Sequence, residues 1–191
     1  MSAAVLYGPA AWVVLLGAAA SFLPRGRRLP VALGAMGLGL APLLAGESLA
    51  MALHGAFAAP SFTLLQLALR RLLAPRSPGY LGAGSAGVLL MIALVFYPPA
   101  LGLGPFDPYG LGYQPLPLLL ALLPLAGWLA WRRQQGWLVI LGGDLLAYAA
   151  GLFGNLWDAL FDPLLVLLAA ATLVAAWISR RRSGRSVAGR W

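Results

Sequence analysis

Residues 30 to 71 read PVALGAMGLGLAPLLAGESLAMALHGAFAAPSFTLLQLALRR, and this run decides how many times the chain crosses a membrane. A membrane-spanning helix needs about 20 mainly apolar residues, and the run is about twice that long. A short polar step, Gly46-Glu47-Ser48, divides it. The run therefore predicts two spans, at about residues 30–46 and 49–69.

The composition of the whole chain indicates a lipid bilayer as its environment. Of the 191 residues, 61% are hydrophobic and only 9% are charged, whereas charged residues make up about a quarter of a soluble domain. No polar stretch is long enough to fold as a second domain. We expect one transmembrane helical bundle at residues 1–179, followed by a basic cytoplasmic tail at residues 180–191.

The remaining apolar runs complete the predicted fold. Each run stops at an arginine cluster or at a loop rich in proline and glycine. The fold class is therefore all-α, a polytopic membrane bundle of seven spans. The five further spans are predicted at about residues 5–23, 80–101, 116–131, 137–154 and 163–178.

The arginine clusters predict the orientation, because short cytoplasmic loops hold the excess of positive charge. With all four clusters in the cytoplasm, seven spans place the N-terminus outside and the C-terminus inside. Without a span at residues 49–69, the clusters no longer share one side. We expect a multi-pass protein of the plasma membrane, in bacteria the inner membrane. The clusters are Arg25/Arg27/Arg28, Arg70/Arg71/Arg76, Arg132/Arg133 and Arg180/Arg181/Arg182/Arg185/Arg190.

A six-span alternative arises at residues 56–75. Thr63, Gln66 and Arg70 fall on one helical face, as in an amphipathic helix that lies at the membrane surface. Pro60 also removes a helix hydrogen bond. A re-entrant segment at this proline would be tolerated if protein covers it. The alternative fold has six spans plus one interfacial or re-entrant segment.

Asp144 is the most informative polar residue, because it lies near the middle of the predicted span 137–154. A carboxylate at that depth costs a few kcal/mol. Tyr148 and Asn155 continue the same predicted helical face, and Gly143 and Ala147 form a ridge that permits close helix packing. Two interpretations stay open: a proton, cation or substrate site, or a neutral carboxyl group that braces two helices.

Glu47 and His54 are a second pair of candidates. They are seven residues apart and share one face if their helix begins one turn early. His54 is the only histidine, and a structural role is the favoured explanation for it. The alternative is that Glu47, His54 and Asp144 converge and relay protons.

The loop before the last span contains a third group of candidates. Asp158 is one helical turn from Asp162, and aromatic residues flank it. Two carboxylates at this spacing could bind a cation or act as acid and base, although solvated loop charges are the simpler account. Asp162-Pro163 is typical of a helix start, with the aspartate as N-cap and the proline at the first helical position.

Composition also excludes several classes of function. The chain has no cysteine and one histidine, so we expect no metal site and no organic cofactor. Its net charge of +8 comes entirely from arginine. In a membrane protein such charge marks cytoplasmic flanks rather than a nucleic-acid surface.

Three functional hypotheses remain, and the sequence identifies no substrate. The first is a binding or accessory subunit of a membrane assembly, whose partners are the lipid bilayer and another membrane protein. The second is a small proton- or cation-linked transporter that uses Asp144. The third is a membrane enzyme that acts on a lipid-linked substrate at the outer face through Glu47, Asp107, Asp158 and Asp162.

Overall fold

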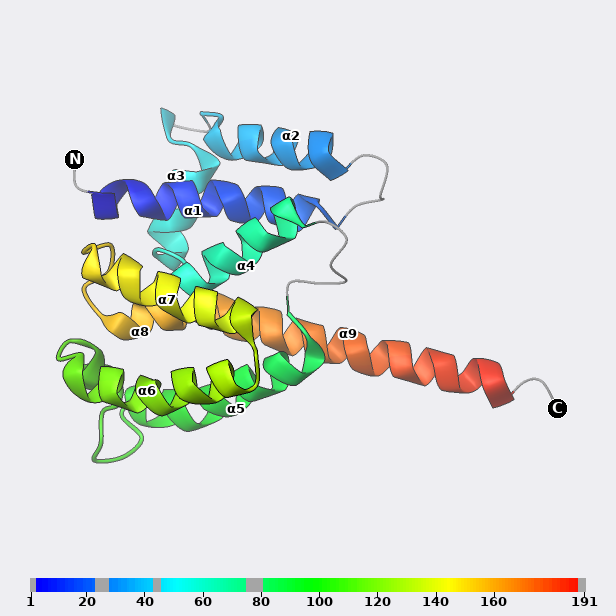
Figure 1. Ribbon diagram of the computed structural model, residues 1–191. Coiled ribbons are helices and arrows are strands. Elements are labelled where there is room, and N and C mark those ends of the chain that lie inside the picture. The colour runs from blue at the N-terminus through cyan, green and yellow to red at the C-terminus, as the bar shows by residue number, and fades with distance from the viewer. Residues whose placement is uncertain (1–2, 23–27, 43–45, 75–80, 189–191) are drawn as a thin grey trace. The chain divides into compact units, whose positions relative to one another are not determined.

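The computed structural model of the protein describes residues 3–22, 28–42, 46–74 and 81–188 (Figure 1). These residues form helices joined by loops, and no β-strand occurs among them. In chain order the elements are α1 (Ala3–Ala20), α2 (Arg28–Leu40), α3 (Leu49–Phe57), α4 (Phe62–Leu73), α5 (Ala83–Ala100), the 3₁₀ helix η3 (Tyr109–Gly112), α6 (Leu116–Trp131), α7 (Gln135–Ala149), α8 (Leu156–Leu160) and α9 (Pro163–Ala188).

Three helical stretches are long and apolar enough to cross a membrane, as judged by length and composition. They are α1, α5 and the stretch Leu156–Arg182, which contains α8 and most of α9. The all-helical fold class is therefore confirmed, and the three stretches are compatible with a membrane protein. The other predicted spans correspond to shorter helices.

Two of the predicted boundaries agree closely with the structure. The predicted span at residues 116–131 is α6, with the same first and last residues. α3 begins at Leu49, directly after the polar step at residues 46–48 as predicted, and Gly46 within that step has a φ of 84°. Ser48 caps α3, since its side chain accepts a hydrogen bond from the backbone N–H of Met51.

The predicted span at residues 49–69 is not one continuous helix. The helix is interrupted after Phe57, so that the nine residues of α3 and the twelve residues of α4 are separate helices. Pro60 has no backbone N–H to donate, and Ser61 acts as the N-cap of α4 by accepting from the N–H of Leu64 at 3.2 Å. The break lies at Pro60, the proline from which the sequence predicted a lost helix hydrogen bond.

The continuous helix predicted at residues 137–154 is also wrong at its end. α7 stops at Ala149, and Gly151 follows with a φ of 73°. Glycine adopts this left-handed conformation without the steric cost that a Cβ atom causes. Asn155 then caps the short helix α8 instead of extending α7. The predicted stripe from Asp144 to Asn155 on one helix therefore does not exist.

The predicted span at residues 30–46 corresponds to the shorter helix α2. Its thirteen residues extend over about 20 Å at 1.5 Å per residue, against about 30 Å for the hydrocarbon core of a bilayer. Residues 43–45 lie outside the described part of the chain, as do Arg25, Arg27, Arg76 and Arg190 of the predicted arginine clusters.

The chain divides into two compact units. The larger unit comprises Met1–Tyr80 and Tyr109–Asp162, and the smaller one Leu81–Pro108 and Pro163–Trp191. In the larger unit, α4 lies between α1 and α7 and contacts both (Figure 1). Its core consists of Tyr7, Ala11, Leu118, Ala147, Phe153, Leu156 and Ala159.

The smaller unit is a pair of helices, α5 and α9, packed on each other. α9 has 26 residues and continues through Arg180, Arg181 and Arg182 as far as Ala188. The first residues of the predicted basic tail thus belong to the same helix as the apolar segment before them. The Arg181 guanidinium lies 3.7 Å from the centre of the Trp177 ring.

Candidate functional site

Asp144 is the centre of a hydrogen-bonded polar cluster between α7 and α4. Its side chain is buried, with 1% of the residue exposed. The Thr63 hydroxyl donates to Oδ2 of Asp144 at 2.6 Å, and Nε2 of Gln66 donates to Oδ1 at 2.9 Å. Asp144 therefore faces the protein interior and contacts polar groups of another helix.

The two donors reach Asp144 because they are spaced three residues apart and so lie on one face of α4. Gln66 also donates to the backbone oxygen of Ile140 at 2.9 Å, so both hydrogens of its amide group are used. Thr63 is buried and Gln66 is half-buried. This part of the polar face of α4 therefore contacts protein, whereas the interfacial alternative requires it to face water.

Close approach of α4 and α7 depends on a glycine. A Cβ atom at Gly143 would lie 2.5 Å from Oε1 of Gln66, closer than real contacts allow. Gly143 belongs to the small-residue ridge predicted from the sequence, and Ala147 of the same ridge is buried in the core. Gly151, four residues after Ala147, lies beyond the end of α7.

The position of α4 is set by the unwound segment at residues 58–61. In this segment the backbone oxygen of Ala58 accepts from Nε1 of Trp12 at 3.0 Å, and that of Pro60 accepts from the Tyr7 hydroxyl at 2.8 Å. The backbone N–H of Ser61 donates to the carboxylate of Asp162. Unwound backbone is tolerated at membrane depth only where protein satisfies it, and these three side chains do so.

Ala58 has an unusual backbone conformation, with a φ of 61° and a ψ of −167°. This region is essentially restricted to glycine and costs other residues about 1–3 kcal/mol. Strained backbone of this kind persists only where the surrounding structure enforces it. The hydrogen bond from Trp12 to the Ala58 oxygen is one such constraint.

Asp158 and Asn155 belong to a second cluster, which organises the loop that contains η3. The Tyr109 hydroxyl donates to Oδ1 of Asp158 at 2.9 Å, and Nδ2 of Asn155 donates to the Tyr109 backbone oxygen at 3.1 Å. Oδ1 of Asn155 accepts from the N–H of Trp157. Burial and the hydrogen bond to Asp158 raise the pKa of Tyr109 above its ordinary value, so the phenol stays neutral.

The other candidate residues do not join Asp144. The His54 ring lies against Gly8 of α1, and its buried Nδ1 has no hydrogen-bond partner among the described residues. Glu47 is exposed, and Tyr148 is half-buried at the edge of the core. The hydrogen bonds of Asp144 come from α4 and not from Glu47 or His54, so the structure gives no support to the predicted proton relay.

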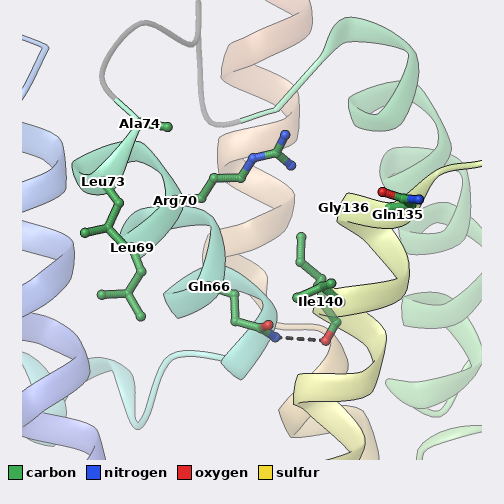
Figure 2. A pocket seen from close by; sticks show the side chains of 9 residues that line it. Gln66, Leu69, Arg70, Leu73, Ala74, Gln135, Gly136 and Ile140 are labelled. Atoms are coloured by element: carbon green, nitrogen blue, oxygen red, sulfur yellow. Dashed lines mark hydrogen bonds between the residues drawn. The ribbon is translucent and has the colours of Figure 1, made fainter.

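An open groove lies between α4 and α7, with a volume of about 530 Å³. Leu69, Leu73, Val139 and Ile140 form its apolar walls, and Gln66 connects it with Asp144 through the hydrogen bond described above. Figure 2 shows the Arg70 guanidinium extending from α4 toward the start of α7, where Gln135 and Gly136 lie. We refer to this feature as the α4–α7 groove.

The chain was compared with known families and proteins, and no protein family, curated protein or solved structure matches it. Within the described residues, no three side chains of histidine, aspartate or glutamate are grouped so that they could hold a metal ion. The absence of a metal site and of a cofactor stays a prediction.

The sequence identified Asp144 but not the residues that bind it. Thr63 and Gln66 form one polar helical face in the sequence, which the six-span alternative places at the membrane surface. A buried carboxylate needs hydrogen-bond donors, and this polar face offered two. That requirement is the signal that could have paired them with Asp144. Tyr7, Trp12 and Asp162, which satisfy the unwound segment, gave no local signal of that role.

Proposed function

We propose that the protein is a small proton- or cation-linked carrier of the bacterial inner membrane, with Asp144 as the group that binds the ion. The observation that supports this most directly is the attachment of Asp144 to α4, one half of an interrupted helix. Interrupted helices and intramembrane carboxylates are recurrent features of the ion sites of secondary transporters.

The proposed topology has seven crossings, in which α3 and α4 together form one interrupted crossing. Their nine and twelve residues together match the length of about 20 that one span requires. This arrangement keeps all arginine clusters on the cytoplasmic side, with the N-terminus outside and the C-terminus inside. Short helices such as α2 and α7 then need neighbouring helices or a thinner bilayer around them.

The chemistry of the cluster offers a way to couple ion binding to movement. An ionised Asp144 accepts from both Thr63 and Gln66, as observed. A protonated carboxyl group is itself a donor: the Thr63 hydroxyl can turn to accept from its O–H, and the Gln66 amide nitrogen still donates to its carbonyl oxygen. Both bonds then lose the charge assistance of a carboxylate acceptor, which weakens the attachment of α4 to α7 and favours a change in the position of α4.

The absence of native cysteine permits a direct test of this coupling. We would introduce Ala59→Cys in the unwound segment and follow its reaction with a maleimide in reconstituted vesicles, across pH values and with Na⁺ or K⁺. The labelling rate is corrected for the ordinary pH dependence of the thiolate fraction, which is measured on a denatured sample. We expect a further dependence of the labelling rate on pH or cation, and Asp144→Asn should abolish it because an amide does not titrate.

Glu47→Gln is the matched control, since Glu47 is an exposed carboxylate outside the Asp144 cluster. This variant should keep the dependence. If the labelling rate follows the thiolate fraction alone in all three proteins, or if Asp144→Asn retains the dependence, the carrier proposal fails.

An accessory subunit remains a second proposal, and the smaller unit supports it. Met91, Leu94 and Val95 of α5 and Leu167 of α9 are all more than 60% exposed, so this two-helix unit offers apolar surface to a membrane partner or to lipid. A stoichiometric partner that co-purifies with the full chain and is lost on removal of these side chains would favour this function.

The enzyme hypothesis gains less support from the structure. Asp158 accepts a hydrogen bond from Tyr109 and Asp162 from the Ser61 backbone, so both carboxylates stabilise loop structure. The α4–α7 groove is lined by neither of them.

A further inference from the structure

The α4–α7 groove combines one cationic group with apolar walls. Leu73 and Val139, which flank it, are 82% and 70% exposed. Arg70 is also exposed, and its guanidinium reaches toward Gly136 (Figure 2). A ligand that fills this groove needs a negative charge at one end and an apolar body.

Arg70 has no negative partner within the described part of the chain. No carboxylate lines the groove, and no ion pair of Arg70 occurs among the described residues. Its neighbour Arg71 differs, because it is buried, with 5% exposed, and lies 4.8 Å from the centre of the Phe22 ring. Arg70 is thus available to a ligand, whereas Arg71 takes part in the protein interior.

The start of α7 adds a second positive feature beside Arg70. The N-cap of this fifteen-residue helix is Gln134, and its side chain makes no capping hydrogen bond. The first N–H groups of a helix are free to bind an anion, and the helix dipole favours negative charge there. Gln135 and Gly136, the first residues of α7, line the groove on the side toward which Arg70 extends.

We propose that the α4–α7 groove binds an anionic phospholipid of the cytoplasmic leaflet. The phosphate group contacts the Arg70 guanidinium and the start of α7, and one acyl chain lies along Leu69, Leu73 and Val139. Arginine suits a phosphate because its planar fork donates two parallel hydrogen bonds. The inference rests on the proposed topology, which places Arg70 at the cytoplasmic surface, where anionic lipids gather.

Lipid is the occupant that the chemistry of the groove favours over a soluble anion. A soluble anion would use only the guanidinium and the start of α7 and leave the exposed leucine and valine side chains uncovered. A phospholipid covers these side chains and supplies the charge in one molecule. The open form of the groove also suits a ligand that enters sideways from the bilayer.

Native mass spectrometry of the full-length protein in mild detergent tests the proposal. The protein is mixed with equal amounts of phosphatidylglycerol and phosphatidylcholine that carry the same acyl chains. We expect phosphatidylglycerol to be retained roughly tenfold more. Both lipids offer a phosphate to Arg70, but the quaternary ammonium of phosphatidylcholine cancels its negative charge and is repelled by the guanidinium and the start of α7. Arg70→Gln should remove this preference and leave the weak binding of phosphatidylcholine unchanged.

Arg181→Gln is the matched control, because Arg181 is an exposed arginine stacked on Trp177 in the other unit. It should retain the preference. If Arg70→Gln and Arg181→Gln lose the preference for phosphatidylglycerol equally, the lipid is attracted by surface charge in general and the proposed site is wrong. The proposed site is also wrong if Arg70→Gln keeps the preference.

A second pair of variants changes the shape of the groove and not its charge. Gly136→Leu places a side chain where a Cβ atom would already be 2.9 Å from Nη1 of Arg70, so it should displace the guanidinium and lower lipid retention. Gly142→Leu adds the same side chain to the same helix where no atom lies within 4 Å of the Cβ position, and should not.

A competition with glycerol phosphate distinguishes the two sources of phosphate. Millimolar glycerol phosphate should leave the bound lipid in place, and its displacement would overturn the assignment to a lipid. Because lipid in detergent reaches both sides of the protein, this experiment does not depend on topology. Asp144→Asn should retain the lipid, so failure of the carrier proposal and failure of this site can be told apart.

Discussion

Asp144 shows how a buried carboxylate is stabilised by donors from another helix. Both of its oxygens accept hydrogen bonds, one from Thr63 and one from Gln66, and only 1% of the residue is exposed. Removing an acceptor from such a cluster leaves the donors unsatisfied, which costs more than the net value of the hydrogen bonds themselves. The consequences of substitution therefore depend on whether the new residue still accepts.

Asp144→Asn should keep the fold, because its amide oxygen can accept from Gln66 and the Thr63 hydroxyl can accept from its amide nitrogen. Asp144→Ala leaves Thr63 and Gln66 without their acceptor and should lower the free energy of unfolding by about 1–3 kcal/mol relative to Asp144→Asn. Thermal unfolding in detergent measures the difference. Equal melting temperatures for the two variants would show that the hydrogen bonds to Thr63 and Gln66 do not stabilise the protein.

Tyr7→Phe tests the support of the unwound segment. The substitution removes the hydroxyl that donates to the Pro60 oxygen and keeps the ring, whose centre lies 5.0 Å from that of Phe153. The buried Pro60 oxygen is then unsatisfied, and we expect a loss of about 1–3 kcal/mol in unfolding free energy. Tyr148→Phe is the control, since Tyr148 packs at the edge of the same core without such a bond. A loss of similar size in the control would contradict the assignment.

At the scale of elements, the interruption between α3 and α4 and the contact of α4 with α7 determine the site. The interruption directs Thr63 and Gln66 toward α7, and Gly143 allows Gln66 to approach it. For each feature, we expect the same substitution at two adjacent residues to change stability in different directions. The two residues are of the same type and lie next to each other, so the difference reports the strain or the contact at one of them.

Ala58→Gly should stabilise the protein, whereas Ala59→Gly should destabilise it. Glycine relieves the conformational cost of about 1–3 kcal/mol at Ala58, where φ is 61°. At either position, glycine also makes the unfolded chain more flexible, which lowers stability by about 0.4–1 kcal/mol. The described non-glycine residues with a positive φ are Ala58 and Arg133, so Ala59 gains no relief. Unfolding midpoints that shift in the same direction for both variants would disprove the strain at Ala58.

Gly143→Ala should weaken the contact between α4 and α7, and Gly142→Ala should not. Alanine in place of glycine favours a helix by up to about 1 kcal/mol at either position. At Gly143 the new Cβ atom would meet the Gln66 side chain, which must then give up hydrogen bonds to Asp144 and Ile140. We expect a lower melting temperature for Gly143→Ala and an unchanged or higher one for Gly142→Ala, and the reverse order would refute the close contact.

At the scale of the whole molecule, the helix lengths and the arginine clusters together constrain the topology. Three helical stretches have the length and composition of a span, and the other helices are shorter. A topology based on length alone would leave residues 49–73 on one side of the membrane. The arginine distribution instead requires α3 and α4 together to act as one crossing, if all clusters are cytoplasmic.

Reporter fusions decide between these topologies. A reporter fused after Arg76 should behave as cytoplasmic, and one fused after Leu103, in the loop that follows α5, should behave as periplasmic. The first fusion distinguishes seven spans from six, because Arg76 follows α4 directly in the sequence. Alkaline phosphatase activity and fluorescence of a cytoplasm-dependent protein report the two sides. A periplasmic signal after Arg76 excludes the seven-span topology.

The sequence by itself determined the helical class and the burial of Asp144 with polar partners. Both follow from local rules: long apolar runs favour helices, and a carboxylate within such a run requires partners. It also determined the bounds of α6 and the start of α3, because these helices begin and end at residues that local rules recognise. Proline, polar steps and arginine clusters act over a few residues and can be recognised in the chain.

Tertiary structure decided where the apolar runs are interrupted and which donors reach Asp144. The unwound segment at residues 58–61 is stable because Tyr7, Trp12 and Asp162 satisfy it, and these residues are 46 to 101 positions away along the chain. Thr63 and Gln66 lie 81 and 78 positions from Asp144. An apolar run can be one helix or two at similar local cost, and only contacts between distant residues select the interrupted form.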